Sequence, residues 1–239
     1  MSALTINSLN LHHGLLHAVR DLTLSVSNGE VVALVGANGA GKTTLLRAIA
    51  GSHQPTSGTI SLDGVDITHV PGHRRVGMGI ALVPEGRRLF AQMTVEENLL
   101  LGRMAGRAGS WSVERVLEVF PNLKARRNAK AGTLSGGEQQ ATAIGRALMS
   151  NPSVLLLDEV SLGLSPLAVD RVYESLSGLM RSGTTIVLVE QDLNRALRVA
   201  QRVVCMLEGR VVLEAPAEGL SRERVTGAYF GLKREVVPA

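Results

Sequence analysis

The feature of this sequence that most restricts the fold is a glycine-rich stretch, GANGAGKT, at residues 36–43. It follows an unbroken apolar run, VVALV (31–35), which is typical of a strand buried on both faces. The helical sequence TLLRAIA (44–50) comes next. In this order, glycines let backbone N–H groups and a helix N-terminus approach phosphate oxygens closely. The stretch therefore predicts an α/β fold with a phosphate-binding loop.

The loop also carries the side chains that nucleotide chemistry requires. We expect Lys42 to reach the β- and γ-phosphates and the Thr43 hydroxyl to be a ligand of Mg²⁺. An ordinary glycine-rich turn between a strand and a helix is the weaker alternative. The predicted ATP-binding residues of this stretch are Gly36, Ala37, Asn38, Gly39, Ala40, Gly41, Lys42, Thr43 and Thr44. Lys42 is also assigned to catalysis.

A second apolar run, VLLLDE (154–159), ends in two acids. In a chain with a phosphate loop, the first acid, Asp158, is predicted to hold Mg²⁺ directly or through water. The second, Glu159, points the other way and is predicted to accept a proton from the attacking water. Two solvated acids at a strand end are the alternative, which the four preceding aliphatic residues and the phosphate loop disfavour.

Strand and helix patterns alternate along the rest of the chain. Strands are expected at 3–11, 22–27, 59–64 and 184–190, and a hairpin at 203–213. Thr94 and Glu97 are expected to form a capping box at the start of one helix, and Pro121 is expected to stop another. We therefore predict one α/β domain over residues 1–239 with a largely parallel sheet. Its nucleotide-binding core is expected at about 1–84 and 153–239, and a helical insert at about 85–152.

Composition restricts the class of protein further. Hydrophobic residues make up 45% of the 239 positions, and the longest apolar runs have the length of strands, well short of the roughly 18 residues of a membrane span. The N-terminus shows no secretion signal, and the single Cys205 lies in an apolar run, so a reducing cytoplasm is expected. The net charge of +4 invites a nucleic-acid hypothesis, but no interleaved aromatic residues offer a stacking platform, and we predict no nucleic-acid partner.

The stretch LSGGEQQ (134–140) resembles a helix start with a capping box, formed by Ser135 and Glu138. Two glycines at the first helical positions lower helix propensity by about 1 kcal/mol each relative to alanine. Bare backbone N–H groups at a helix start form an anion site. Because the phosphate loop already provides one anion site, we expect the two sites to serve different nucleotides and each to be completed by a second subunit.

The order of GANGAGKT, LSGGEQQ and VLLLDE resembles the ATP-binding subunit of ABC transporters, over essentially the whole chain. This resemblance implies an ABC-type P-loop ATPase with an N-terminal antiparallel β part and a helical subdomain. It also implies a head-to-tail dimer in which the signature motif binds the γ-phosphate of the partner's ATP. The residues implied in that role are Ser135, Gly136, Gly137 and Glu138.

Finer motifs are similar to those of the smaller ATPase subunit of branched-chain amino acid importers. They are VPEGRRLF (83–90), MTVEENLLLG (93–102), AIGRALMS (143–150), SLGLSP (161–166) and VEQD (189–192). The resemblance implies an ATP-hydrolysing subunit on the cytoplasmic face of the membrane. It further implies two permease subunits, a second and different ATPase subunit, and an indirect link to a solute-binding protein. A urea or short-amide importer is the nearest alternative, and a soluble nucleic-acid-associated ABC ATPase is a more distant one.

The chain departs from the general family pattern at several positions. Glu85 stands where most members have a glutamine beside Mg²⁺, and Gln191 replaces the switch histidine. Both replacements are also common in the branched-chain branch, as is Leu164 in place of an aspartate. His13 occupies the position of the aromatic residue that stacks on adenine, and Val160 replaces a proline. The resemblance thus assigns Glu85 to the metal, Gln191 to catalysis and His13 to ATP binding.

The general base gives the first prediction. Glu159→Gln should still bind ATP but should lose at least about a hundredfold in turnover, because the proton acceptor is removed. Steady-state phosphate release and equilibrium ATP binding measure the two effects separately. Undiminished turnover in this variant would disprove the assignment of the base.

Overall fold

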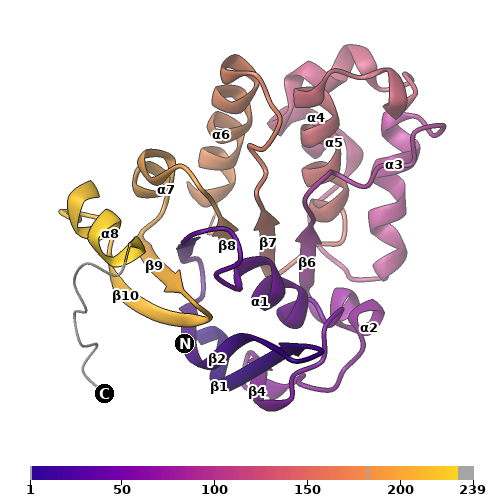
Figure 1. Ribbon diagram of the computed structural model, residues 1–239. Helices are drawn as coiled ribbons and strands as arrows, with labels where there is room; N and C mark the ends of the chain where they lie inside the picture. Colours follow the sequence, from indigo (N-terminus) through magenta and orange to yellow (C-terminus); the bar gives the residue numbers. More distant parts are fainter. Residues whose placement is uncertain (1, 182, 231–239) are drawn as a thin grey trace.

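The computed structural model describes residues 2–181 and 183–230, and its central element is a six-stranded sheet (Figure 1). Five neighbouring strands run parallel, and the edge strand β10 pairs antiparallel with β9. The order across the sheet is β10 (Arg210–Pro216), β9 (Arg202–Leu207), β3 (Val31–Val35), β8 (Thr185–Val189), β7 (Val154–Asp158) and β6 (Ile80–Val83).

A second, antiparallel sheet is formed mainly by the N-terminal residues and lies at the bottom of Figure 1. Its order is β2 (Leu16–Ser27), β1 (Ser2–His13), β4 (Ser57–Leu62) and β5 (Val65–Asp66). Buried residues alternate with exposed ones along the second half of β2, as expected for a strand with one face on the core. This pattern had predicted a strand at 22–27.

The three central strands of the larger sheet are buried on both faces. In β7, Leu155 and Leu157 belong to one apolar cluster, whereas Val154 and Leu156 belong to another. Strand β8 divides its residues between the same two clusters. One cluster includes the helices drawn in the upper right of Figure 1, and the other includes α1 (Lys42–Ile49) and the N-terminal sheet. Burial on both sides explains why these strands read as unbroken apolar runs.

The chain between β6 and β7 folds into helices, drawn at the upper right of Figure 1. They are α3 (Val95–Leu101), α4 (Val113–Val119) and α5 (Gly136–Leu148), joined by the 3₁₀ turns η1 (Gly102–Ala105), η2 (Pro121–Arg126) and η3 (Ala131–Thr133). The expected capping box at Thr94 and Glu97 is present at the start of α3. Whether residues 85–152 form a separate subdomain stays a prediction, and the predicted domain limits at 1 and 239 lie outside the described residues.

Four further helices follow or flank the strands. They are α2 (Gly72–Met78), α6 (Pro166–Arg181), α7 (Leu193–Val199) and α8 (Arg222–Tyr229). The α/β class with a mainly parallel sheet and an N-terminal antiparallel part is therefore confirmed. Sequence patterns missed α2, β6 and α8. Pro121, which was expected to stop a helix, also begins the 3₁₀ turn η2.

Cys205 lies in β9 and is fully buried, as its apolar surroundings in the sequence predicted. Burial raises the pKa of its thiol to about 11, and the nearby Lys42 charge opposes this effect. A thiol with this pKa is almost entirely protonated near neutral pH, so Cys205 acts as an apolar core residue.

Arg75 joins α2 to the end of α1 and is fully buried. Its guanidinium donates to the carbonyl oxygens of Ala48 (2.8 Å) and Ile49 (2.9 Å) in the last turn of α1. It also donates to Thr68 O (2.9 Å) and Val70 O (2.7 Å) in the segment before α2. A helix C-terminus presents unpaired carbonyls and a partial negative charge, which a cation satisfies. Arg75 therefore fixes the helix that begins at the phosphate loop.

We predict that Arg75→Met destabilises the chain by at least about 3 kcal/mol, because several buried carbonyl groups lose their donor at once. The neighbouring Arg74 is exposed, so Arg74→Met is the matched control and should change stability by less than about 0.5 kcal/mol. Urea denaturation followed by circular dichroism measures both. Equal midpoints for the two variants would contradict a structural role for Arg75.

Candidate functional site

The register of three parallel strands brings the predicted site residues to one edge of the sheet. Val189 of β8 lies between Leu34 of β3 and Asp158 of β7. The phosphate loop, Glu159 and the segment beginning at Glu190 therefore leave the sheet at the same level. Ligands bind at the carboxyl ends of strands in sheets of this kind, so the strand register alone places the site.

The phosphate loop passes so close to neighbouring backbone that glycine is required at two positions. Gly36 has φ 147°, and a Cβ there would lie 2.2 Å from the carbonyl oxygen of Met206. Gly41 has φ 99°, and a Cβ would lie 2.3 Å from the carbonyl oxygen of Ala18. A side chain at either position would displace the loop from β9 or β2. The glycines thus fix where the loop lies as well as how it bends.

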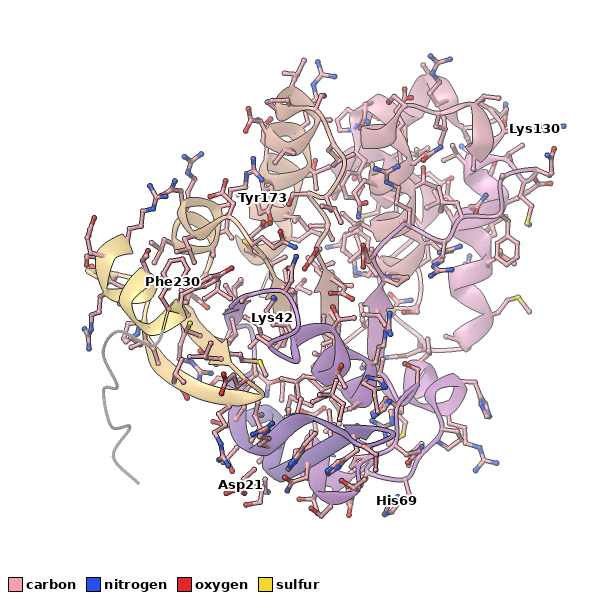
Figure 2. All side chains as sticks on the ribbon, viewed as in Figure 1. Asp21, Lys42, His69, Lys130, Tyr173 and Phe230 are labelled. Atoms are coloured by element: carbon pink, nitrogen blue, oxygen red, sulfur yellow. The ribbon has the colours of Figure 1, made fainter. Side chains whose placement is uncertain are left out.

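Lys42 is the first residue of α1, and its side chain folds back over the loop (Figure 2). Its ammonium donates to the carbonyl oxygens of Gly36 (2.7 Å) and Ala37 (3.0 Å), and the residue is 4% exposed. Burial lowers the pKa of Lys42, and the charges of Glu159 and Asp158 oppose this effect. A buried cation is thereby held at the mouth of the loop, where phosphate oxygens would add negative charge.

Two oxygen groups, one from helix α1 and one from strand β7, meet beside the loop. The Thr43 hydroxyl donates to Asp158 Oδ1 at 3.0 Å, and Asp158 is 3% exposed. Burial raises the pKa of Asp158, and the neighbouring charges of Glu159 and Glu85 raise it further, whereas the Thr43 hydrogen bond lowers it. Two other acids thus repel the Asp158 carboxylate beside the Thr43 hydroxyl. A hard cation with oxygen ligands would relieve their repulsion.

The Gln191 side chain contacts both the phosphate loop and the residue that follows β7. Its Nε2 donates to Glu159 Oε2 at 2.7 Å and to Asn38 Oδ1 at 3.2 Å. Glu159 adopts a left-handed backbone conformation with φ 48°, an uncommon conformation for a non-glycine residue. The Gln191 amide therefore fixes the direction of the Glu159 carboxylate. Sequence reasoning assigned both residues but could not show this contact.

A pocket of about 440 Å³ brings together ten of the predicted site residues. Where β1 and α1 meet at this pocket, His13 Nε2 lies 3.2 Å from Thr44 Oγ1. The His13 ring packs on the His53 ring with 4.4 Å between the ring centroids. His53 was not predicted, because it lies in a polar turn far from His13 in sequence. The predicted residues that line this pocket are His13, Asn38, Gly39, Gly41, Lys42, Thr43, Thr44, Glu85, Glu159 and Gln191.

The signature residues lie elsewhere, at the start of α5. Ser135 caps the helix, and the Glu138 carboxylate accepts from the Ser135 N–H at 2.8 Å. A Cβ on Gly136 would lie 3.1 Å from Leu164 Cδ2, and one on Gly137 would lie 3.0 Å from Ala168 Cβ. The two glycines therefore also permit tight packing of α5 against the start of α6. Ser135, Gly136, Gly137 and Glu138 line a second pocket of about 320 Å³, distinct from the phosphate-loop pocket.

The family model for ABC transporters matches residues 19–161, more than half of the chain. The chain belongs to the ABC transporter ATPase family. It is therefore an ATP-binding protein of this family and an ATP hydrolase. No helix among the described residues is both long enough and apolar enough to cross a membrane.

Two proteins of Pseudomonas aeruginosa are similar over nearly their whole length. The high-affinity branched-chain amino acid transport ATP-binding protein BraG is 45% identical, over 95% of this chain and 99% of BraG. The high-affinity branched-chain amino acid transport ATP-binding protein BraF is 32% identical, over 95% of this chain and 97% of BraF.

Among solved structures, a dimeric ATP-binding cassette in a post-hydrolysis state, bound to ADP and Pi, superposes with a TM-score of 0.80. It is 26% identical, and the alignment covers 91% of this chain and all of that cassette. The fold described above is thus one that, in a relative, holds the products of ATP hydrolysis.

The close approach at Gly36 can be tested in the ABC ATPase directly. Gly36→Ala should weaken ATP binding by about a hundredfold, because a Cβ on the Met206 carbonyl displaces the loop from its productive position. Gly39→Ala is the matched control: its φ is +83° but a Cβ meets no atom within 4 Å. In Gly39→Ala, backbone strain of about 1–2 kcal/mol from the left-handed conformation should weaken ATP binding tenfold or somewhat more.

Isothermal titration with ATP measures both variants, and thermal melting verifies that each is folded. Equal losses for the two alanine variants would show that conformational strain alone, and not the contact with β9, makes Gly36 necessary.

Proposed function

We propose that this chain is the ATP-hydrolysing subunit of an importer for branched-chain amino acids. The observation that carries the proposal is the 45% identity to BraG over essentially both chains. The gathering of a phosphate loop, an acid pair and Gln191 around one pocket supports hydrolysis as the activity. The solute itself meets other subunits in transporters of this type, so the substrate class rests on the comparison.

The residues beside the loop fit a magnesium nucleotide. The described part of the chain holds no cluster of three or more His, Cys, Asp or Glu side chains arranged for a metal ion. Mg²⁺ is commonly bound by one or two carboxylates together with substrate phosphates, which matches Thr43, Asp158 and Glu85. When bound, Mg²⁺ neutralises charge on the phosphates. The loop N–H groups and Lys42 orient the phosphate chain, while His13 offers a ring for the base.

Glu159 is the proposed general base. Its carboxylate lies in the same pocket as Lys42 and is held by the Gln191 amide at 2.7 Å. A carboxylate held in this way can accept the proton of an attacking water. Gln191 orients the base and, unlike a histidine, cannot become a cation near neutral pH.

A second ATPase subunit would complete the site. Ser135, Gly136 and Gly137 line a separate pocket of this chain, which suits binding of the γ-phosphate held by a partner in a head-to-tail dimer. A solved cassette of the same fold is a dimer, which supports pairing of two ATPase subunits. BraG and BraF are different proteins of one organism with the same named role, and this chain is more similar to BraG. We infer that the partner is a different, BraF-like chain.

The permease subunits would dock on the Glu85 loop and the helical insert, where a groove opens between the insert and α2. This groove of about 540 Å³ lies between α2, α3, α5 and the residues before α3. Phe90 and Met104 line it and are 56% and 82% exposed, so two large apolar side chains are available to a partner in one groove. Docking there would hold the chain on the cytoplasmic face of the membrane. A solute-binding protein would contact the permeases and not this chain.

The test is uptake of labelled leucine and labelled urea by cells that lack this gene and carry either wild type or Lys42→Ala. Wild type should restore leucine uptake, and Lys42→Ala should lose at least about 90% of it, since the buried cation orients the phosphates. Lys130 is exposed and distant from Lys42 in Figure 2, so Lys130→Ala is the matched control and should restore uptake fully.

Restoration of urea uptake instead would leave the transport mechanism standing and replace the substrate class. Restoration of neither solute would overturn the importer proposal for both substrate classes.

A further inference from the structure

Glu190 is a buried acid that the mechanism above does not use. It follows β8 directly and is 2% exposed. We propose that Glu190 is a positioning residue for ATP hydrolysis, whose buried carboxylate ties the segment after Glu159 to the segment that carries Gln191. This inference rests on the proposed roles of Glu159 and Gln191 in hydrolysis.

One carboxylate oxygen fixes the backbone around Gln191. Glu190 Oε1 accepts from the backbone N–H groups of Gln191 at 2.9 Å and of Asp192 at 3.0 Å. Asp192 in turn caps α7 by accepting from the backbone N–H groups of Asn194 and Arg195. The backbone of Gln191 is therefore held between a buried carboxylate and a capped helix. Its side chain is exposed, but the position of its Cα is fixed.

The other oxygen holds the segment that follows Glu159. Glu190 Oε2 accepts from the Ser161 hydroxyl at 3.0 Å and from the Tyr173 hydroxyl of α6. Ser161 lies two residues after Glu159, and Tyr173 is 8% exposed. Burial raises the pKa of Tyr173, and the Glu190 charge raises it further, so the phenol stays protonated and remains a donor. Figure 2 labels Tyr173 on α6, above Lys42.

The same carboxylate thus fixes both ends of one catalytic contact. Gln191 Nε2 reaches Glu159 Oε2 at 2.7 Å, and each residue belongs to a segment that Glu190 binds. A shift of either segment would lengthen the Gln191–Glu159 contact. Small misplacements of groups near the reacting atoms lower the rate of the reaction strongly. The segment continues to Leu164, whose side chain lies against Gly136 of the signature motif. Glu190 therefore also fixes the loop that joins the two pockets.

A role in stability alone is the competing explanation, because any buried carboxylate with four donors contributes to folding. The two explanations differ in what they predict for catalysis. A positioning residue affects turnover through Gln191 and Glu159, whereas a purely structural residue affects the amount of folded protein. Turnover per folded molecule separates them.

We would measure ATP turnover by the assembled importer for wild type, Glu190→Ala and Glu190→Gln. Glu190→Ala removes all four acceptor contacts and should lower kcat at least tenfold, with KM for ATP changed less than threefold. Glu190→Gln should keep at least a third of the activity. Its amide oxygen can still accept from the two backbone N–H groups, and the two hydroxyls can accept from its NH₂ group.

A double-mutant cycle tests whether the effect passes through Gln191. In a Gln191→Ala background, adding Glu190→Ala should change kcat less than threefold, because the contact is already lost. The matched control is Thr68→Val, which removes a buried hydroxyl outside the site that donates to Asp66 and accepts from the backbone N–H of Ile60. Thr68→Val should lower the melting temperature and leave kcat per folded molecule unchanged.

Ser161→Ala and Tyr173→Phe each remove one donor and keep the inference testable if Glu190→Ala does not fold. Each should lower kcat about threefold. Wild-type turnover in folded Glu190→Ala, or in both single-donor variants, would overturn the inference alone. Multiplicative losses in the double mutant would overturn it as well. Failure of the wild-type importer to hydrolyse ATP would instead overturn the proposed function on which it rests.

Discussion

The parallel alignment of β3, β8 and β7 is the constraint on which the rest of this structure depends. Val189 is paired with Leu34 on one side and with Asp158 on the other, so three distant parts of the sequence end at one level. A shift of one residue in either pairing would turn every side chain of a strand to the opposite face. The buried clusters on both faces of the sheet oppose such a shift. Apolar packing therefore sets the positions of the charged site residues.

The buried charges of the chain fall into two kinds. Arg75 and Glu190 are surrounded by hydrogen-bond partners, four carbonyl groups in the first case and four donors in the second. Asp158 is almost as buried, but its environment raises its pKa, and two other acids lie nearby. A buried acid whose ionised form is disfavoured by its surroundings in the protein is suited to bind a cation. The contrast separates residues proposed to hold the site in place from Asp158, which is proposed to bind the metal ion.

The sequence predicted the fold well where a pattern repeats with a clear period. The apolar runs at 31–35, 154–158 and 185–189 are strands, and the capping boxes at Thr94 and Ser135 begin helices. It failed at α2, whose sequence GHRRVGM has no apolar face and whose conformation depends on the buried Arg75. Strand β6 is four residues long, too short for its run to be separated from the loop that follows.

The site was predictable in its residue types but not in its contacts. Phosphate loops and strand-end acids are local patterns, so Lys42, Asp158 and Glu159 could be named as candidates one by one, and their roles stay predictions. The contacts of Glu190 join residues that lie 29 and 17 positions away in the sequence. At the end of a strand, a glutamate reads as a solvated acid. Only the folded chain shows that α6 covers it and provides a hydroxyl.

The glycines of the signature motif show how one residue type can serve two requirements at once. As bare backbone at a helix start, Gly136 and Gly137 leave N–H groups open to an anion. As residues without a Cβ, they allow α5 to approach Leu164 and Ala168. This close approach places α5 against the loop between Glu159 and α6. The same loop is bound to Glu190 through the Ser161 hydroxyl. A phosphate bound at the signature pocket would therefore contact a helix packed against the loop that follows Glu159, the proposed general base. This contiguity gives a physical route by which the two ATP sites of the proposed head-to-tail dimer would influence each other.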